Sequence, residues 1–171
     1  MIDIIKIKPI VEKEKVMVLG GSVFYDNILF KSLKNSKVKT MSNLYKKYDV
    51  DNLSNKNLCT EKAIRFYSTF KNIRNYKSII IQLGEYEITN NIKLEEFKTN
   101  LEELVKCINE FSSKIILVGL NARYLKIDKR YNDAIIEIAK KYKVEFISLV
   151  SEYNFRVVTD SALNKALKLS L

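Results

Sequence analysis

Ser22 stands at the end of a predicted strand, where catalytic and binding groups gather in parallel α/β sheets. It follows two glycines at the end of the apolar run that extends from Val16 to Leu19. A serine hydroxyl is a weak nucleophile, and an adjacent base is its usual means of activation. The usual base is histidine, and the 171 residues contain none. They therefore cannot form a Ser-His-Asp or Cys-His system, or a zinc site with histidine ligands.

Two other interpretations of Ser22 remain open. A lysine, for example Lys165, is an alternative base for the serine. Serine is also a good N-cap, and a helix that begins near Val23 would use Ser22 in that way. In the first case Ser22 is a nucleophile, and in the second it is a structural residue.

Short apolar runs rich in β-branched residues predict the strands that would position Ser22. Their near-continuous hydrophobicity is typical of parallel strands that are covered on both faces. These runs occupy residues 16–19, 78–83, 114–118 and 144–149. We expect one more short strand at residues 47–50, within a segment rich in lysine and asparagine.

Helical patterns lie between the predicted strands. Apolar residues recur there at steps of three and four, which gives each helix one apolar stripe. The patterns occupy residues 63–70, 94–111 and 131–142, with Thr60 and Asp128 as the expected N-caps of the first and the last. Strands that alternate with helices predict an α/β fold with a parallel, doubly wound sheet, in a single domain over residues 1–171.

Glycines gather at the ends of the predicted strands. Gly20 and Gly21 end the first run, Gly84 follows the run at 78–83, and Gly119 follows the run at 114–118. In a parallel sheet, ligands and catalytic groups gather beyond the carboxyl ends of the strands. Tight turns between strand and helix would also explain these glycines.

In order and spacing, these blocks resemble those of the SGNH/GDSL-type hydrolases. The run that ends in Gly20-Gly-Ser22 resembles the first block, a strand that ends in Gly-Asp-Ser. The run that ends in Gly84-Glu-Tyr-Glu87 resembles the third block, which ends in Gly-x-Asn-Asp. The resemblance covers residues 15–164. It implies a flavodoxin-like, three-layer α/β/α sandwich with five parallel strands, and esterase chemistry by a serine, a histidine and an aspartate.

Position by position, the resemblance retains part of the family's site. Ser22 matches the nucleophile and Asp160 the aspartate of the triad, whereas Leu163 occupies the position of the base. Asp160 would serve equally as an N-cap for a final helix. The positions that the resemblance assigns to oxyanion stabilisation and ligand binding are Gly21, Asn57, Gly84 and Tyr86.

Several of these binding positions depart from the family's residue types. Gly21 replaces an aspartate, and Asn57 is the nearest match to a glycine of the second block. Tyr86 replaces an asparagine, and Glu87 replaces the aspartate after it. The hydroxyl of Tyr86 could donate to a bound anion in place of the amide, or its ring could serve only for packing.

The charge of the chain favours anionic partners. Lys and Arg number 30 against 20 Asp and Glu, which gives a formal net charge of +10. Such a surface attracts anions in general, although a lysine-rich composition alone would also produce it. We expect a small ester, or an acylated or anionic ligand, as the partner, and favour nucleic acid less. No apolar run approaches the length of a membrane span, so we expect a cytoplasmic protein, without metal or cofactor. The oligomeric state stays open.

The sequence thus favours an SGNH-like domain without Ser-His-Asp esterase activity, retained as a binding or scaffolding module. One alternative is a divergent esterase that uses Ser22 with a base other than histidine. The other is a basic module that binds anions or nucleic acid.

Overall fold

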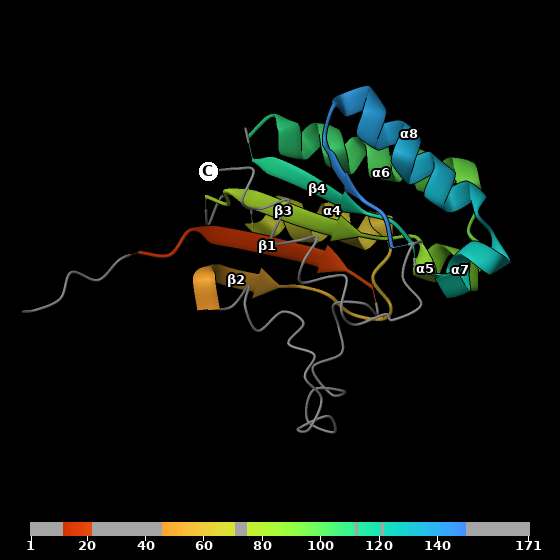
Figure 1. The fold of residues 1–171 in the computed structure, drawn as a ribbon, viewed down its shortest axis with the longest axis horizontal. Helices are drawn as coiled ribbons and strands as arrows, with labels where there is room; N and C mark the ends of the chain where they lie inside the picture. The colour runs from red at the N-terminus through yellow and green to blue at the C-terminus, as the bar shows by residue number, and fades with distance from the viewer. Residues whose placement is uncertain (1–11, 22–45, 71–74, 112, 121, 150–171) are drawn as a thin grey trace, which may run out of the picture.

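The computed structural model describes residues 12–21, 46–70, 75–111, 113–120 and 122–149. Within them lies one sheet of five parallel strands in the order β2-β1-β3-β4-β5 (Figure 1). The strands are β1 (Lys15–Gly20), β2 (Asp49–Asn52), β3 (Ser78–Gln82), β4 (Lys114–Val118) and β5 (Glu145–Ile147). The five-stranded parallel sheet expected from the sequence is therefore confirmed.

Three long helices pack side by side on one face of the sheet (Figure 1). They are α4 (Thr60–Phe70), α6 (Leu94–Asn109) and α8 (Arg130–Tyr142). Helices α6 and α8 each connect neighbouring parallel strands, β3 to β4 and β4 to β5. Helix α4 leads from β2 to β3, which lie on either side of β1. Two short helices, α5 (Glu85–Thr89) and α7 (Ala122–Ile127), follow β3 and β4 directly.

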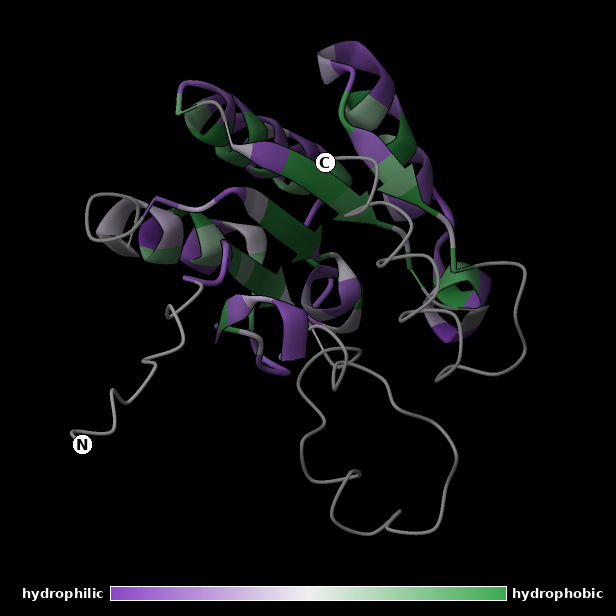
Figure 2. Ribbon diagram, turned by 60° about the vertical axis from the view of Figure 1, so that its left-hand side comes forward, coloured by the Kyte–Doolittle hydropathy of each residue, from purple (hydrophilic) through white to green (hydrophobic). Residues whose placement is uncertain are grey.

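The main core lies between the sheet and these three helices. Apolar side chains of α6, among them Phe97, Leu101 and Leu104, are fully buried against β3, β4 and the flanking helices. The ring of Phe97 packs on that of Tyr131, with 5.2 Å between the ring centroids, and so ties α6 to α8. Figure 2 shows the hydrophobic strands and the alternation of hydrophobic and hydrophilic residues along these helices. This alternation is the stripe that the sequence predicts.

Side chains on the opposite face of the sheet are buried as well. Val16, Val18, Ile80, Ile116 and Val118 form a second apolar cluster there, and each is at most 1% exposed. Both faces of the sheet are thus covered, as a three-layer sandwich requires. This also explains why the strands read as nearly continuous apolar runs.

Some local expectations were wrong by a few residues. Thr60 is the first residue of α4 and not its cap, and its backbone N–H donates to the distant carboxylate of Glu87. The N-cap of α8 is Lys129, while Asp128 accepts the N–H of Arg130 from one position further out. The second strand is Asp49–Asn52, shifted by two residues from the expected 47–50.

The strand order reverses between β1 and β3. From β1 the chain continues to β2 on one side, whereas β3, β4 and β5 follow in order on the other. In open α/β sheets, the carboxyl ends of the two strands at such a switch point flank the place where ligands bind. Here these ends are Gly20 and Gln82, which pair directly in register.

Candidate functional site

The four expected binding residues lie together at the carboxyl end of the sheet. Gly21 follows β1, Asn57 lies in the loop after β2, and Gly84 and Tyr86 form the turn from β3 into α5. Ser22, Asp160, Leu163 and Lys165 fall outside the described residues.

Gly21 is locked to β3 through its backbone. Its N–H lies 2.9 Å from the carbonyl oxygen of Gln82 and 3.1 Å from Oε1 of the same residue. Both Gly21 and Gln82 are buried. The backbone that leads to position 22 is therefore held by the strand across the switch point, as positioning a reactive or binding group requires.

Glu85 fills the space beside Gly21. A Cβ atom on Gly21 would lie 2.8 Å from Oε2 of Glu85, too close for any side chain unless the carboxylate moves. The Glu85 side chain is buried, and its Oε1 accepts a hydrogen bond of 3.3 Å from Nε2 of Gln82. A carboxylate is thus present beside position 21, but residue 85 supplies it. The sequence alone did not lead us to assign Glu85 to the site. The pattern that indicates it is a glycine at position 21 together with an acidic residue directly after Gly84.

Gly84 is required by the turn into α5. Its φ is +115°, in the left-handed region that residues with a Cβ atom rarely adopt. A Cβ atom there would also lie 3.2 Å from Cδ2 of Leu120, two residues after β4 ends. Gly84 therefore shapes the site through its backbone and brings Tyr86 and Glu87 to the carboxyl end of β3.

The loop that carries Asn57 is fixed along β1. The N–H of Leu53 donates to the carbonyl of Val18 at 2.9 Å, and that of Asn55 donates to Gly20 at 3.0 Å. The side chain of Asn55 then accepts the N–H of Asn57 at 2.9 Å. These bonds hold the start of α4 next to the end of β1.

Lys62 joins Asn57 to Tyr86. From the first turn of α4, its ammonium donates to the backbone carbonyl of Asn57 at 3.2 Å. The same Nζ lies 5.3 Å from the centroid of the Tyr86 ring, within cation–π range. Sequence reasoning missed Lys62, which stands only two residues after the expected cap Thr60. Together, Gly21, Asn57, Lys62, Glu85 and Tyr86 form what we call the carboxyl-end site.

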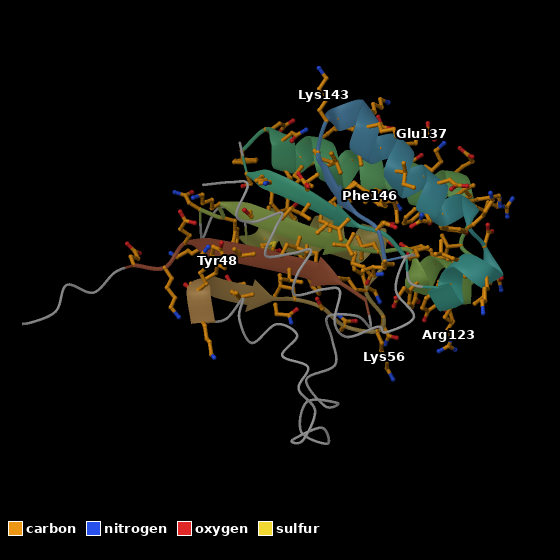
Figure 3. All side chains as sticks on the ribbon, viewed as in Figure 1. Tyr48, Lys56, Arg123, Glu137, Lys143 and Phe146 are labelled. Carbon is orange, nitrogen blue, oxygen red and sulfur yellow. The ribbon has the colours of Figure 1, made fainter. Side chains whose placement is uncertain are left out.

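Two further cations lie at this end of the molecule. Figure 3 shows Lys56, from the same loop as Asn57, and Arg123, from α7, at the same end of the molecule as the carboxyl-end site. Both side chains are exposed. Among the described residues, no group of three or more cysteine and carboxylate side chains could hold a metal ion.

Glu87 connects α5 to α4 beneath the site. Its Oε1 accepts the backbone N–H of Thr60 at 2.7 Å, and the side chain is fully buried. Oε2 has no hydrogen-bond partner. Burial raises the pKa of the Glu87 carboxyl, and the bond from Thr60 opposes that shift only in part. A buried carboxyl with one unpaired oxygen is a costly feature that most structures avoid.

None of the described helices combines the length and the apolar character that crossing a membrane would need.

Neither a protein-family model nor a curated protein matches the sequence. Solved structures do match.

Three esterases and lipases illustrate the structural similarity. A GDSL-like lipase from Bacteroides thetaiotaomicron aligns with a TM-score of 0.69 and 14% identity, over 92% of this chain and 89% of its own. Esterase EstA from Pseudoalteromonas sp. aligns with a TM-score of 0.63 and 11% identity, over 92% and 96%. Axe2, an acetylxylan esterase from Geobacillus stearothermophilus, aligns with a TM-score of 0.62 and 13% identity, over 92% and 82%.

These neighbours share the layered architecture described above. At such low identities the similarity concerns the fold, and the chemistry must be argued from this chain's own residues. With its parallel sheet in the order β2-β1-β3-β4-β5 and its site at the switch point, the chain has the fold of the SGNH/GDSL-type hydrolases.

Proposed function

We propose that this protein is an SGNH/GDSL-type domain that binds a small ligand at the carboxyl-end site and does not hydrolyse esters by a Ser-His-Asp mechanism. One observation carries the proposal: a chain with this hydrolase fold has no histidine in its 171 residues. In Axe2, one of its structural neighbours, a variant in which histidine is replaced by alanine is described as a catalytic mutant. A serine without such a base is a weak nucleophile.

The residues of the site support binding over catalysis. The resemblance assigns an amide donor to position 86, and this chain has a tyrosine there with an ammonium against its ring. An oxyanion hole works through donors aimed at the charge that develops in the transition state. The ammonium of Lys62 also attracts a ligand that is already negative in its ground state.

Labelling with a fluorophosphonate probe tests this proposal, because such probes react only with activated serines. We expect neither labelling nor release of p-nitrophenolate from short-chain p-nitrophenyl esters by the wild-type protein. Labelling of the wild type that is lost in Ser22→Ala would overturn the proposal. Ser68→Ala is the matched control, since Ser68 is an exposed serine on α4.

A second candidate function is a divergent esterase, favoured by the position of Glu85. Its buried carboxylate approaches the residue directly before Ser22, where a Cβ atom on Gly21 would lie 2.8 Å away. A carboxylate there could act as a base other than histidine. In that case the wild-type protein would be labelled, and both Ser22→Ala and Glu85→Gln would abolish labelling.

A further inference from the structure

We infer that Lys62, beside Tyr86 and Asn57, binds the carboxylate group of a small organic acid. The inference rests on the proposed function, because it names the ligand class of that binding site. It is carried by three residues from separate segments: the loop after β2, the first turn of α4, and α5.

The Lys62 ammonium is held in place but keeps its charge available. The carbonyl of Asn57 and the ring of Tyr86 restrict it from two directions. Within the described part of the chain, no carboxylate forms an ion pair with it. The nearest acidic residue in sequence, Glu61, pairs with Arg65 one turn along α4. An ammonium has three donors, so at least one remains for a ligand.

Several other lysines of the described residues form ion pairs with carboxylates. Lys77 pairs with Glu14, Lys98 with Glu137, and Lys141 with Glu102. Their charges are neutralised within the protein. Lys62, in contrast, presents its charge at the carboxyl end of the sheet, where parallel α/β proteins bind their ligands.

The chemistry of the cluster selects an anion over a neutral ester. A hydrogen bond from an ammonium to a carboxylate is about twice as strong as one between neutral groups. Asn57 and Tyr86 stand at the positions that the resemblance assigns to stabilising an oxyanion. Because the Lys62 ammonium lies by both residues, a ligand carboxylate, which is charged in its ground state, can bind there. The Tyr86 hydroxyl, which donates to no described residue, can supply a second hydrogen bond.

One cation at the centre of the cluster favours a ligand with one negative charge. A phosphate monoester carries close to two charges at neutral pH, and its recognition is the usual role of arginine forks or several cations. Lys56 and Arg123 lie at the same end of the molecule (Figure 3), but the cation that binds Asn57 and lies over the Tyr86 ring is Lys62. We therefore assign a monocarboxylate to this cluster.

Comparing hexanoate with its neutral isostere hexanamide tests the inference. Both are titrated into the full chain, and binding is measured from amide chemical shifts in proton–nitrogen NMR spectra. We expect hexanoate to bind at least about tenfold more tightly than hexanamide, from one charged hydrogen bond. This preference should weaken as salt is added, because the site is exposed to solvent.

Three variants separate Lys62 from the general basic charge of the chain. Lys62→Met should abolish the preference for hexanoate, and Lys62→Arg should retain most of it. Lys140→Met is the matched control, because Lys140 is an exposed lysine on α8 and its loss changes net charge equally. This control should bind as the wild type does. Lysine and methionine have similar helix propensities, so both methionine variants should fold.

Several results would overturn the inference. They are equal binding of hexanoate and hexanamide, no saturable binding of hexanoate, an unchanged preference in Lys62→Met, and tighter binding of inorganic phosphate than of hexanoate. Failure of the proposed function is recognised separately, by fluorophosphonate labelling of Ser22. An esterase that still prefers hexanoate through Lys62 would refute the proposed function and support the ligand class.

Discussion

A Cβ atom on Gly21 would lie only 2.8 Å from the carboxylate of Glu85, so the carboxylate would have to move to make room for it. With Glu85 in its present place, glycine fits at position 21, where the resemblance expects an aspartate. The resemblance expects a carboxylate at position 21, directly after β1. In this chain the carboxylate beside that position belongs to Glu85, which follows β3. Gln82 binds both partners, since its side chain accepts the N–H of Gly21 and donates to Glu85.

This relationship predicts coupled effects of substitution. Gly21→Asp should destabilise the fold by about 1–3 kcal/mol, from overpacking and from two carboxylates in one buried place. Combined with Glu85→Gly, the same substitution should cost less, because the space and the charge beside position 21 become free. Urea denaturation of the wild type, both single variants and the double variant gives the coupling free energy. Additive free energies would show that Glu85 and position 21 are independent.

Gly84 supports a second prediction, about the turn that carries Tyr86. Gly84→Ala forces a Cβ atom into the left-handed region and toward Leu120, which should cost at least about 1 kcal/mol. Asn91→Gly is the opposite case, because Asn91 already has a φ of +55° and is exposed. That variant should be as stable as the wild type or slightly more stable. Thermal unfolding of both variants measures the difference, and equal changes in Tm would refute the role of φ.

Glu87 supports a prediction about pH. Burial raises the pKa of its carboxyl, so the folded state holds a proton that the unfolded state has already released. The unfolded state then binds fewer protons, and stability falls as pH rises from the ordinary range of a glutamate through the raised pKa. Glu87→Gln cannot titrate, yet its amide oxygen can still accept the N–H of Thr60. It should therefore remove this part of the pH dependence.

The measurement compares the free energy of unfolding of the wild type and Glu87→Gln from pH 4 to pH 8. We expect the variant to gain stability relative to the wild type as pH rises. Burial also raises the pKa of Tyr131, which therefore stays neutral over this range. Glu87→Ala serves as the contrast, because it leaves the N–H of Thr60 without an acceptor and should destabilise at every pH. A constant difference between wild type and Glu87→Gln would refute the pKa argument.

The sequence allowed the sheet and the long helices to be predicted because their signals are local. A buried strand such as Lys114–Val118 shows as an apolar run, and α6 shows as a stripe of period 3.6. The short helices α5 and α7 were missed, since five or six residues are too few to establish a period. Gly84 was identified by its type, and the structure adds the reason in its positive φ.

The central contacts of the carboxyl-end site could not be predicted, because they join distant positions. Glu85 acts on Gly21, and Glu87 binds the N–H of Thr60 across 27 positions. The residue types around position 60 therefore led to the prediction that Thr60 is an N-cap. Only the fold brings such pairs together. For the same reason Lys62 was not assigned to the site from the sequence, although its partners Asn57 and Tyr86 were.

The final prediction concerns the residue at the expected base position. If Leu163 occupies the place of the histidine, Leu163→His should introduce turnover of p-nitrophenyl esters in a protein that otherwise has none. Tyr86→Asn added to it should raise the rate further, because an amide donor at an oxyanion position contributes about 10²–10³ in kcat. Release of p-nitrophenolate measures both effects, with Leu163→Gln as the control for a polar side chain without a base. Turnover must also vanish when Ser22→Ala is added. If the histidine variants show no turnover, the assignment of Leu163 to the base position is wrong. The absence of a histidine there would then not explain the difference between this chain and an esterase.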